Sequence, residues 1–158
     1  QWGLERQPVR DNALVLAQTN GHQTLRAMTS TSYGRIWDKD VVEAFINADA
    51  QNLKHYTEYE VAPTGEKLDL TLTLPDKDFE WSSAFISPVR IDTQAKKWTT
   101  IMRIPMKSLT PKNPVAGARW RINLYRCDKA HKAYLAWSPT LNGDFHTPER
   151  FGWLEFVE

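Results

Sequence analysis

The sequence is poor in the features that define several large classes of protein. Its 158 residues include one cysteine, Cys127, which excludes an internal disulfide framework and a cysteine-rich metal site. No apolar run approaches the roughly 18 residues of a membrane-spanning helix, so we expect no membrane insertion. Basic and acidic residues number 20 and 19, and the longest basic run is the pair Lys96 and Lys97. This balance argues against nucleic acid or an anionic membrane as a partner.

Helical periodicity is missing as well, since no window of about a dozen residues has apolar positions at helical spacing. Alternating patterns instead predict ten short strands, at residues 12–18, 24–28, 41–48, 56–62, 67–74, 85–93, 98–104, 120–127, 133–137 and 151–157. We therefore expect an all-β chain forming a single domain over residues 1–158. Its predicted architecture is an antiparallel β-sandwich of jelly-roll or immunoglobulin-like type. At most one short helix is expected, at residues 105–109.

Alternation of side chains also predicts which residues share a face of each strand. Two strands offer a polar face that carries tyrosine, one with Arg121, Asn123 and Tyr125 and the other with Tyr56, Glu58 and Glu60. Separately, Glu43 shares a face with the apolar Val41 and Phe45. The strand at 67–74 puts its four leucines on one face and Asp69, Thr71 and Thr73 on the other. If the polar faces lie in one sheet, they form a floor on which a ligand could bind.

The chain is rich in aromatic residues, with seven tryptophans, five tyrosines and six phenylalanines, more than a core of this size needs. Trp37 stands in a charged turn just before a strand. Phe145 follows Asn142 in a loop that Gly143 and Pro148 can turn and stiffen. We expect both rings to be available to a ligand, against the alternative that each covers an end of the core.

Catalytic and metal-binding motifs are absent: there is no HxH, HExxH, GxSxG, P-loop or GxGxxG pattern. Glu43, Glu58 and Glu60 could be the acid and base of a glycosidase, but carboxylates suit the recognition of neighbouring sugar hydroxyls better. We therefore predict a domain that is not itself an enzyme, although it could be attached to one. No cofactor is required; oxygen ligands for a structural calcium could come from the turn aspartates Asp38, Asp40, Asp49 and Asp144.

Several segments, taken in order, resemble the family 9 carbohydrate-binding modules and their bacterial relatives. They read WDKDVVEAFIN, HYTEYEVAPTG, a tryptophan followed by an IP turn at 98–105, WRINLYRCD, and YLAWSPT followed by DFHTPERFGWLEF. The resemblance covers about residues 13–156. It implies a β-sandwich in a secreted or periplasmic bacterial protein that binds mono- or oligosaccharides or polysaccharide ends, often with structural calcium.

The resemblance also implies roles for individual residues. Modules that bind sugar ends clamp the terminal sugar between two aromatic rings, which match Trp37 and Phe145. The glutamate of the VE pair matches Glu43, and the amide before the second aromatic matches Asn142. With Glu60, Tyr125 and Arg121 lining the floor, these residues form the expected site.

The sequence also departs from the family pattern. The family's arginine and asparagine of one strand are Glu60 and Ala62 here, and a glutamine of a later strand is Tyr125. The family's usual opening motif and two N-terminal strands are missing before residue 13, so we expect either a trimmed chain or a sheet that another chain or domain completes.

Two alternatives to sugar binding stay open. Related sandwiches carry haem b in electron-transfer modules, and axial ligands here could come from Met102, Met106, His131 and Lys132. The other alternative is a structural interaction domain whose pocket is vestigial.

Overall fold

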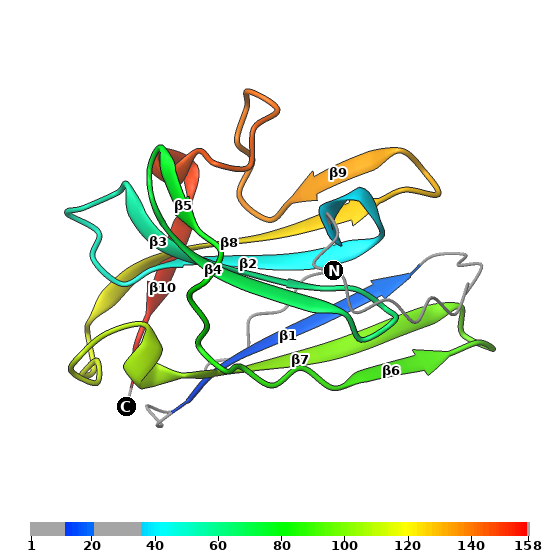
Figure 1. The fold of residues 1–158 in the computed structure, drawn as a ribbon, viewed down its shortest axis with the longest axis horizontal. Helices are drawn as coiled ribbons and strands as arrows, with labels where there is room; N and C mark the ends of the chain where they lie inside the picture. The colour runs from blue at the N-terminus through cyan, green and yellow to red at the C-terminus, as the bar shows by residue number, and fades with distance from the viewer. Residues whose placement is uncertain (1–11, 21–35, 158) are drawn as a thin grey trace.

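The computed structural model describes residues 12–20 and 36–157, which form a sandwich of two antiparallel β-sheets (Figure 1). The predicted all-β class is therefore confirmed. Within the described residues the helices are three single 3-10 turns, none long enough to cross a membrane. They are η1 (Ile36–Asp38), η2 (Met106–Ser108), which falls in the predicted helical turn, and η3 (Pro148–Arg150).

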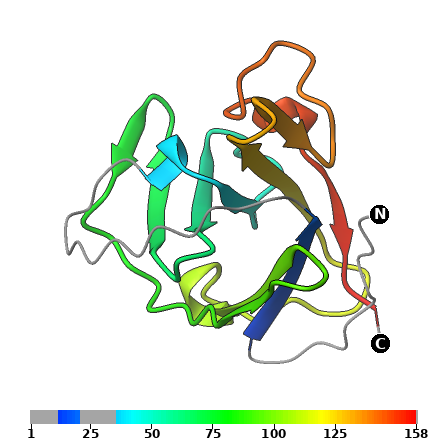
Figure 2. The same ribbon diagram turned by 90° about the vertical axis from the view of Figure 1, so that its right-hand side faces the viewer.

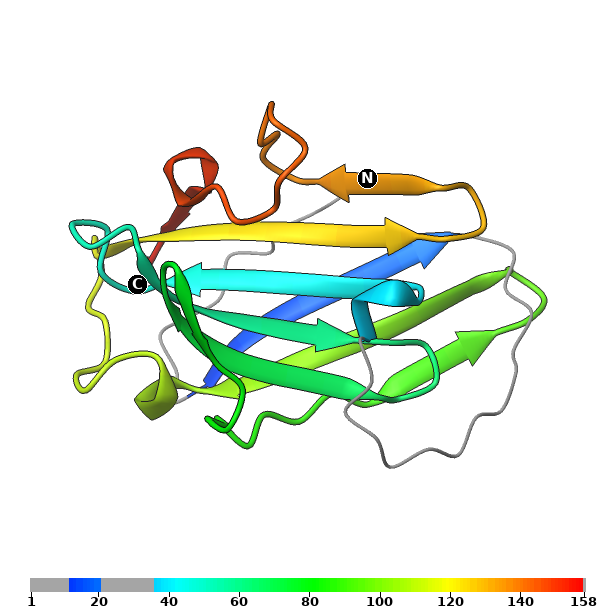
Figure 3. The same cartoon turned by 45° about the horizontal axis from the view of Figure 1, so that its top comes forward.

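The larger sheet has seven strands and follows the order β10-β8-β2-β3-β4-β5, with β9 also paired to β8. Its strands are β2 (Val41–Asn47), β3 (His55–Val61), β4 (Lys67–Thr73), β5 (Asp76–Asp78), β8 (Arg119–Asp128), β9 (Ala133–Ala136) and β10 (Gly152–Glu155). β10 pairs with the first part of β8 and β9 with its last part, so both extend one edge of that long strand (Figure 3).

The smaller sheet has the order β1-β7-β6 and packs across one face of the larger sheet (Figure 2). Its strands are β1 (Asn12–Asn20), β6 (Val89–Asp92) and β7 (Lys97–Pro105). β1 pairs with β7 over its whole length and forms an edge of this sheet. Whether another chain or domain completes the sheet stays a prediction.

The core between the sheets is built from alternate residues of each strand, as a period of two requires. Val42 and Ile46 of β2, Tyr59 of β3, and Trp98 and Met102 of β7 lie in this cluster with less than a tenth of their surface exposed. The residues between them on β2 and β3 must point to the other face of the larger sheet, which is where the polar groups were predicted.

That outer face carries a second cluster of buried side chains. Phe45, Tyr56, Tyr125 and Phe151 pack there, and Leu70 of β4 joins them. The leucines of β4 thus lie on the outer face beside the carboxylates, because Glu58 is paired with Leu70 and Glu60 with Leu68. Residues 137–147, which we call the clamp loop, run past this face after β9 (Figure 1).

The predicted strands within the described residues match the structure with two differences. The strand predicted at 24–28 lies outside the described residues. Of the strand predicted at 85–93, only β6 forms, preceded by an isolated bridge between Ile86 and Arg103. Ser87 and Pro88 separate the two, and proline cannot donate a backbone hydrogen bond to a sheet. The short strand β5 was not predicted.

Candidate functional site

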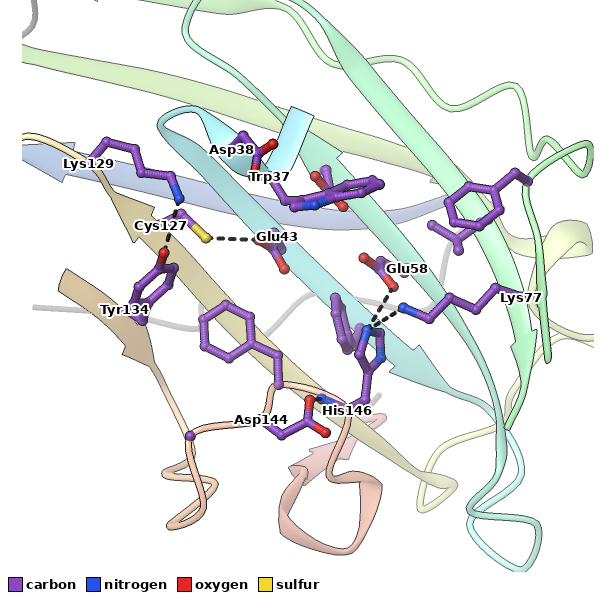
Figure 4. A pocket seen from close by; sticks show the side chains of 16 residues that line it. Trp37, Asp38, Glu43, Glu58, Lys77, Cys127, Lys129, Tyr134, Asp144 and His146 are labelled. Carbon is purple, nitrogen blue, oxygen red and sulfur yellow. Dashed lines mark hydrogen bonds and ion pairs between the residues drawn. The ribbon is translucent and has the colours of Figure 1, made fainter. Parts of the chain in front are cut away.

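A cavity of about 510 Å³ opens on the outer face of the larger sheet, within the range of roughly 300–1,000 Å³ that is usual for ligand pockets. Its floor is formed by β2, β3 and the end of β8. Its walls come from η1, from β5 and the residue after it, from β9 and from the clamp loop (Figure 4). Segments from both halves of the sequence therefore meet at one place.

Three glutamates form the floor of this cavity, and we call Glu43, Glu58 and Glu60 the carboxyl floor. Glu43 stands directly opposite Glu60 in the register of β2 and β3, and Glu58 lies two residues from Glu60 on the same face. Their exposed fractions are 4%, 5% and 1%. A side-chain hydrogen bond joins Glu58 to Glu60, and the Sγ of Cys127 donates to Oε1 of Glu43 at 3.3 Å.

Burial of these acids disfavours their charged form. Loss of hydration, reinforced by Glu58, raises the pKa of Glu43 to about 8. Loss of hydration raises the pKa of Glu60 to about 10, with Glu43 and then Glu58 adding to the effect. The pKa of Glu58 is also raised, mainly by burial. At neutral pH the floor consequently holds protons, and protonated carboxyls both donate and accept hydrogen bonds.

Aromatic side chains form two walls above the floor. Trp37 and Phe79 make one wall, with ring centroids 6.5 Å apart. Phe145 and Tyr134 make the other, with centroids 6.2 Å apart in an edge-to-face arrangement. Both Trp37 and Phe145 are half-buried and pack against the same small cluster around Cys127, so two partly accessible rings border one cavity.

Basic groups lie at the rim of the cavity. Lys77 Nζ is 2.6 Å from Nε2 of His146, whose Nδ1 is 2.6 Å from the hydroxyl of Tyr56. Because an ammonium group can only donate, Nε2 accepts from Lys77 and Nδ1–H of a neutral His146 donates to Tyr56. Burial, and then Lys77, lowers the pKa of His146 to about 4. Lys129 donates to the hydroxyl of Tyr134 at 3.1 Å.

A buried hydrogen-bond network fixes the clamp loop to the sheet. Asn123 is fully buried and donates from Nδ2 to the hydroxyl of Tyr125 and to the carbonyl of Ser138, both at 2.8 Å. Its Oδ1 accepts from the Ser138 amide at 2.9 Å. The Tyr125 hydroxyl donates to the carbonyl of Phe145 at 2.8 Å, and the two rings stack 4.1 Å apart. The position of the Phe145 wall is thus set from β8.

The structure brings four of the seven predicted site residues together in the cavity: Trp37, Glu43, Glu60 and Phe145. Tyr125 lies beneath Phe145, fully buried, and supports the wall from below. The other two do not line the cavity.

Arg121 stacks on Trp153 with 4.0 Å between guanidinium carbon and ring centroid, and it donates to the carbonyl of Phe151. Asn142 stays within the clamp loop, where Nδ2 donates to the Thr147 hydroxyl at 3.0 Å and Oδ1 accepts from the Asp144 amide at 3.0 Å.

Three of the turn aspartates accept hydrogen bonds from backbone amides, and two of the four, Asp38 and Asp144, line the cavity. Asp40 accepts from the Lys129 amide, Asp49 from Gln51 and Asp144 from His146. Over residues 12–20 and 36–157, no group of three or more His, Cys, Asp or Glu side chains is arranged to hold a metal. A structural calcium stays a prediction.

The proposed axial ligands for haem are not brought together. Met102 and Met106 are buried between the two sheets. His131 lies in the turn between β8 and β9, with its Nδ1 3.0 Å from Asp128, and Lys132 follows it in that turn. The haem alternative is not favoured.

Several residues of the cavity were missed from the sequence. Lys77 lies in β5 and Phe79 follows that strand, which has only three residues and is too short to show an alternating pattern. Tyr134 is 63% exposed on a four-residue strand, and an exposed aromatic on a strand is the signal that could have found it. His146 belongs to no sequence motif, although its neighbour Phe145 was predicted to border the site.

The fold and the cavity define a ligand-binding β-sandwich domain. A model of carbohydrate-binding family 9 matches residues 6–156, which is nearly the whole chain. The chain belongs to this family.

Two known proteins are similar to this chain. The chain is 28% identical over 140 residues to an extracellular protein of Arthroderma benhamiae, with 77% of this chain and 63% of that protein aligned. The chain thus spans less than two thirds of the relative's length. A crystal structure from Bacteroides uniformis, described as that of a candidate carbohydrate-binding protein, superposes with a TM-score of 0.74 at 22% identity, covering 92% of this chain and 73% of that one. The second likeness concerns the fold.

Proposed function

We propose that this domain binds carbohydrate without catalysis, with one sugar ring held between Trp37 and Phe145 above the carboxyl floor. The observation that carries the proposal is the cavity itself: in a chain of carbohydrate-binding family 9, two partly accessible aromatic walls border a floor of hydrogen-bonding groups. Aromatic faces pack on the apolar faces of a sugar ring, while carboxyl groups bond its hydroxyls.

In this proposal the polar contacts come from Glu43 and Glu60. Their protonated carboxyls suit hydroxyl groups, which also donate and accept. Asn142, which the family resemblance assigns to the sugar, has both ends of its amide engaged within the clamp loop. We assign it the task of shaping the loop that carries Phe145.

Recognition fits the arrangement of the acids better than hydrolysis does. A glycosidase needs two carboxyl groups that flank the bond to be cleaved. Glu43, Glu58 and Glu60 instead project side by side from neighbouring positions of one sheet face. Secretion fits a module of this family that has an extracellular relative, and we propose it for this protein too.

Titration calorimetry against a panel of mono- and disaccharides tests the proposal. Few contacts and two stacking rings predict weak binding, with dissociation constants of about 10 μM to 1 mM. Trp37→Ala should weaken binding by about tenfold or more. The matched control is Trp153→Ala, because Trp153 is 42% exposed on the same sheet but lies outside the cavity lining.

Equal heats for wild type and Trp37→Ala would refute the site. No heat with any sugar, together with an empty glycan array at high protein concentration, would refute sugar binding and favour the structural interaction domain.

A further inference from the structure

The carboxyl floor contains three acidic side chains, of which the proposed sugar contacts use two, Glu43 and Glu60. Oε2 of Glu58 and Oε2 of Glu60 are buried without a hydrogen-bond partner, on side chains that are 5% and 1% exposed. Both side chains line the cavity, and Figure 4 shows Glu58 directed into it. Buried polar atoms without hydrogen-bond partners are rare in native proteins. Nε2 of His146 lies 4.0 Å from Oε2 of Glu58, too far for a hydrogen bond, so N–H donors of a ligand in the cavity would suit both atoms.

We propose that the cavity selects amino sugars, whose free ammonium group is held by Glu43, Glu58 and Glu60 while the ring packs between Trp37 and Phe145. The proposal rests on the proposed sugar-binding function and names the class of sugar. An ammonium group has three N–H donors and no acceptor, which complements three clustered acids. Hydrogen bonds between charged partners are roughly twice as strong as neutral ones.

The aromatic walls favour the same ligand. A cation within about 6 Å of the face of a tryptophan, tyrosine or phenylalanine ring is attracted by the ring's charge distribution. The walls built by Trp37 with Phe79 and by Phe145 with Tyr134 present such rings above the acids. A cationic sugar therefore meets attractive groups on the floor and on both walls.

The two lysines of the cavity are the competing feature, because they would attract an acidic sugar. Lys77 donates to His146, and Lys129 is held by Tyr134, so both ammonium groups already have partners. The acids are buried, whereas Lys77 is exposed at the rim. The buried acids of the floor therefore determine that the preferred ligand is positively charged.

Binding of an ammonium group is coupled to release of protons. The free floor holds protons at neutral pH, on Glu43 and Glu60, and a bound cation favours the ionised carboxylates. Other titratable or charged groups also face the floor from the elements packed against it: Asp38 from η1, Tyr56 from β3, Lys77 from β5, Tyr125, Cys127 and Lys129 from β8 and its end, Tyr134 from β9, and Asp144 and His146 from the clamp loop. The histidine stays neutral above a pH of about 4, so the carboxyls supply the released protons.

The experiment compares three sugars of one ring shape by calorimetry: glucosamine, N-acetylglucosamine and glucuronic acid. Glucosamine should bind at least about tenfold more tightly than the other two, because acetylation removes the charge and the acid reverses it. Its affinity should rise between pH 5 and 7, by up to about tenfold per pH unit for each proton released. Titration in two buffers of different ionisation enthalpy measures that release directly.

Two substitutions locate the effect. Glu60→Gln should weaken glucosamine binding about tenfold and N-acetylglucosamine binding clearly less, because the glutamine amide still bonds sugar hydroxyls but cannot become a carboxylate. The control Glu155→Gln on β10 should change neither affinity. Lys77→Met should strengthen glucosamine binding, since it removes a competing cation.

Trp37-dependent binding of neutral sugars without a preference for glucosamine or proton release would overturn this inference and leave the proposed function standing. Tighter binding of glucuronic acid, weakened by Lys77→Met, would reverse the sign of the site. Absence of binding by every sugar would refute both proposals.

Discussion

Replacing Glu60 by glutamine should make the fold more stable at neutral pH, and the gain should vanish in mild acid. Glu60 is 1% exposed, and burial with its two acidic neighbours raises its pKa from 4.5 to about 10. Glutamine keeps the shape of the side chain and can donate to Glu58, but it never needs a proton. The substitution therefore isolates the free energy of keeping an acid protonated inside the protein.

The magnitude follows from proton binding at the pH of the measurement. At pH 7 the unfolded chain has lost the Glu60 proton, whereas the folded chain keeps it. Neutral pH lies about 2.5 units above the ordinary pKa of 4.5, and each unit is worth about 1.4 kcal/mol, so folding loses about 3 kcal/mol at this residue. Glu60→Gln should raise the free energy of unfolding by up to that amount.

The sign of the pH dependence is fixed by the direction of the shifts. A folded state with a raised carboxyl pKa binds more protons than the unfolded state. The contribution of these acids to stability is therefore greatest below about pH 4.5, the ordinary pKa of glutamate. It is lost as pH rises through the folded pKa values of about 8 for Glu43 and about 10 for Glu60. Urea unfolding of wild type and Glu60→Gln at pH 4, 5.5, 7 and 8 measures this difference, with Glu155→Gln as control. An equal gain at pH 4 and pH 8, or a loss at pH 8, would contradict the buried, protonated floor.

Two further substitutions test how the clamp loop and its surroundings are held. Gly152→Ala would put a methyl group 2.5 Å from Cη2 of Trp137, so urea unfolding should show a loss of about 1–3 kcal/mol; a free energy of unfolding equal to that of wild type would refute this packing. Asn123→Leu leaves the Ser138 amide and carbonyl without their buried partner. We expect the free energy of unfolding to fall by about 2–4 kcal/mol in the same assay, and sugar binding to weaken. Unchanged sugar affinity would show that the network does not position the loop.

The division of each strand into two faces could be predicted from the sequence, because a period of two is a local property. Glu58 and Glu60 do share a face of β3, opposite Tyr59. What local pattern does not specify is which face meets the other sheet. The leucines of β4 look like core residues of a two-sheet sandwich, yet Leu70 packs on the outer face, where Phe45 and Tyr125 cover it.

The residues missed in the site share a physical reason. Lys77 reaches the cavity only because β5 pairs with β4, through three residue pairs that leave no periodic signal. Arg121 was predicted to line the site, but it lies outside the cavity. Its strand and its face were predicted correctly; however, β8 is ten residues long, and Arg121 lies near its start, beside β10. Position along a strand depends on register, which pattern alone does not give.

The carboxyl floor also bears on whether the cavity is functional or vestigial. Three buried acids destabilise the empty fold at neutral pH, and glutamine or an apolar residue of similar size would fill the same space at lower free-energy cost. A domain that served only to connect other parts would gain stability from such a replacement and lose nothing. Suppose that Glu60→Gln stabilises the fold and at the same time weakens the binding of amino sugars. The acids then lower the stability of the fold but are needed for ligand binding, which a purely structural interaction domain would not explain.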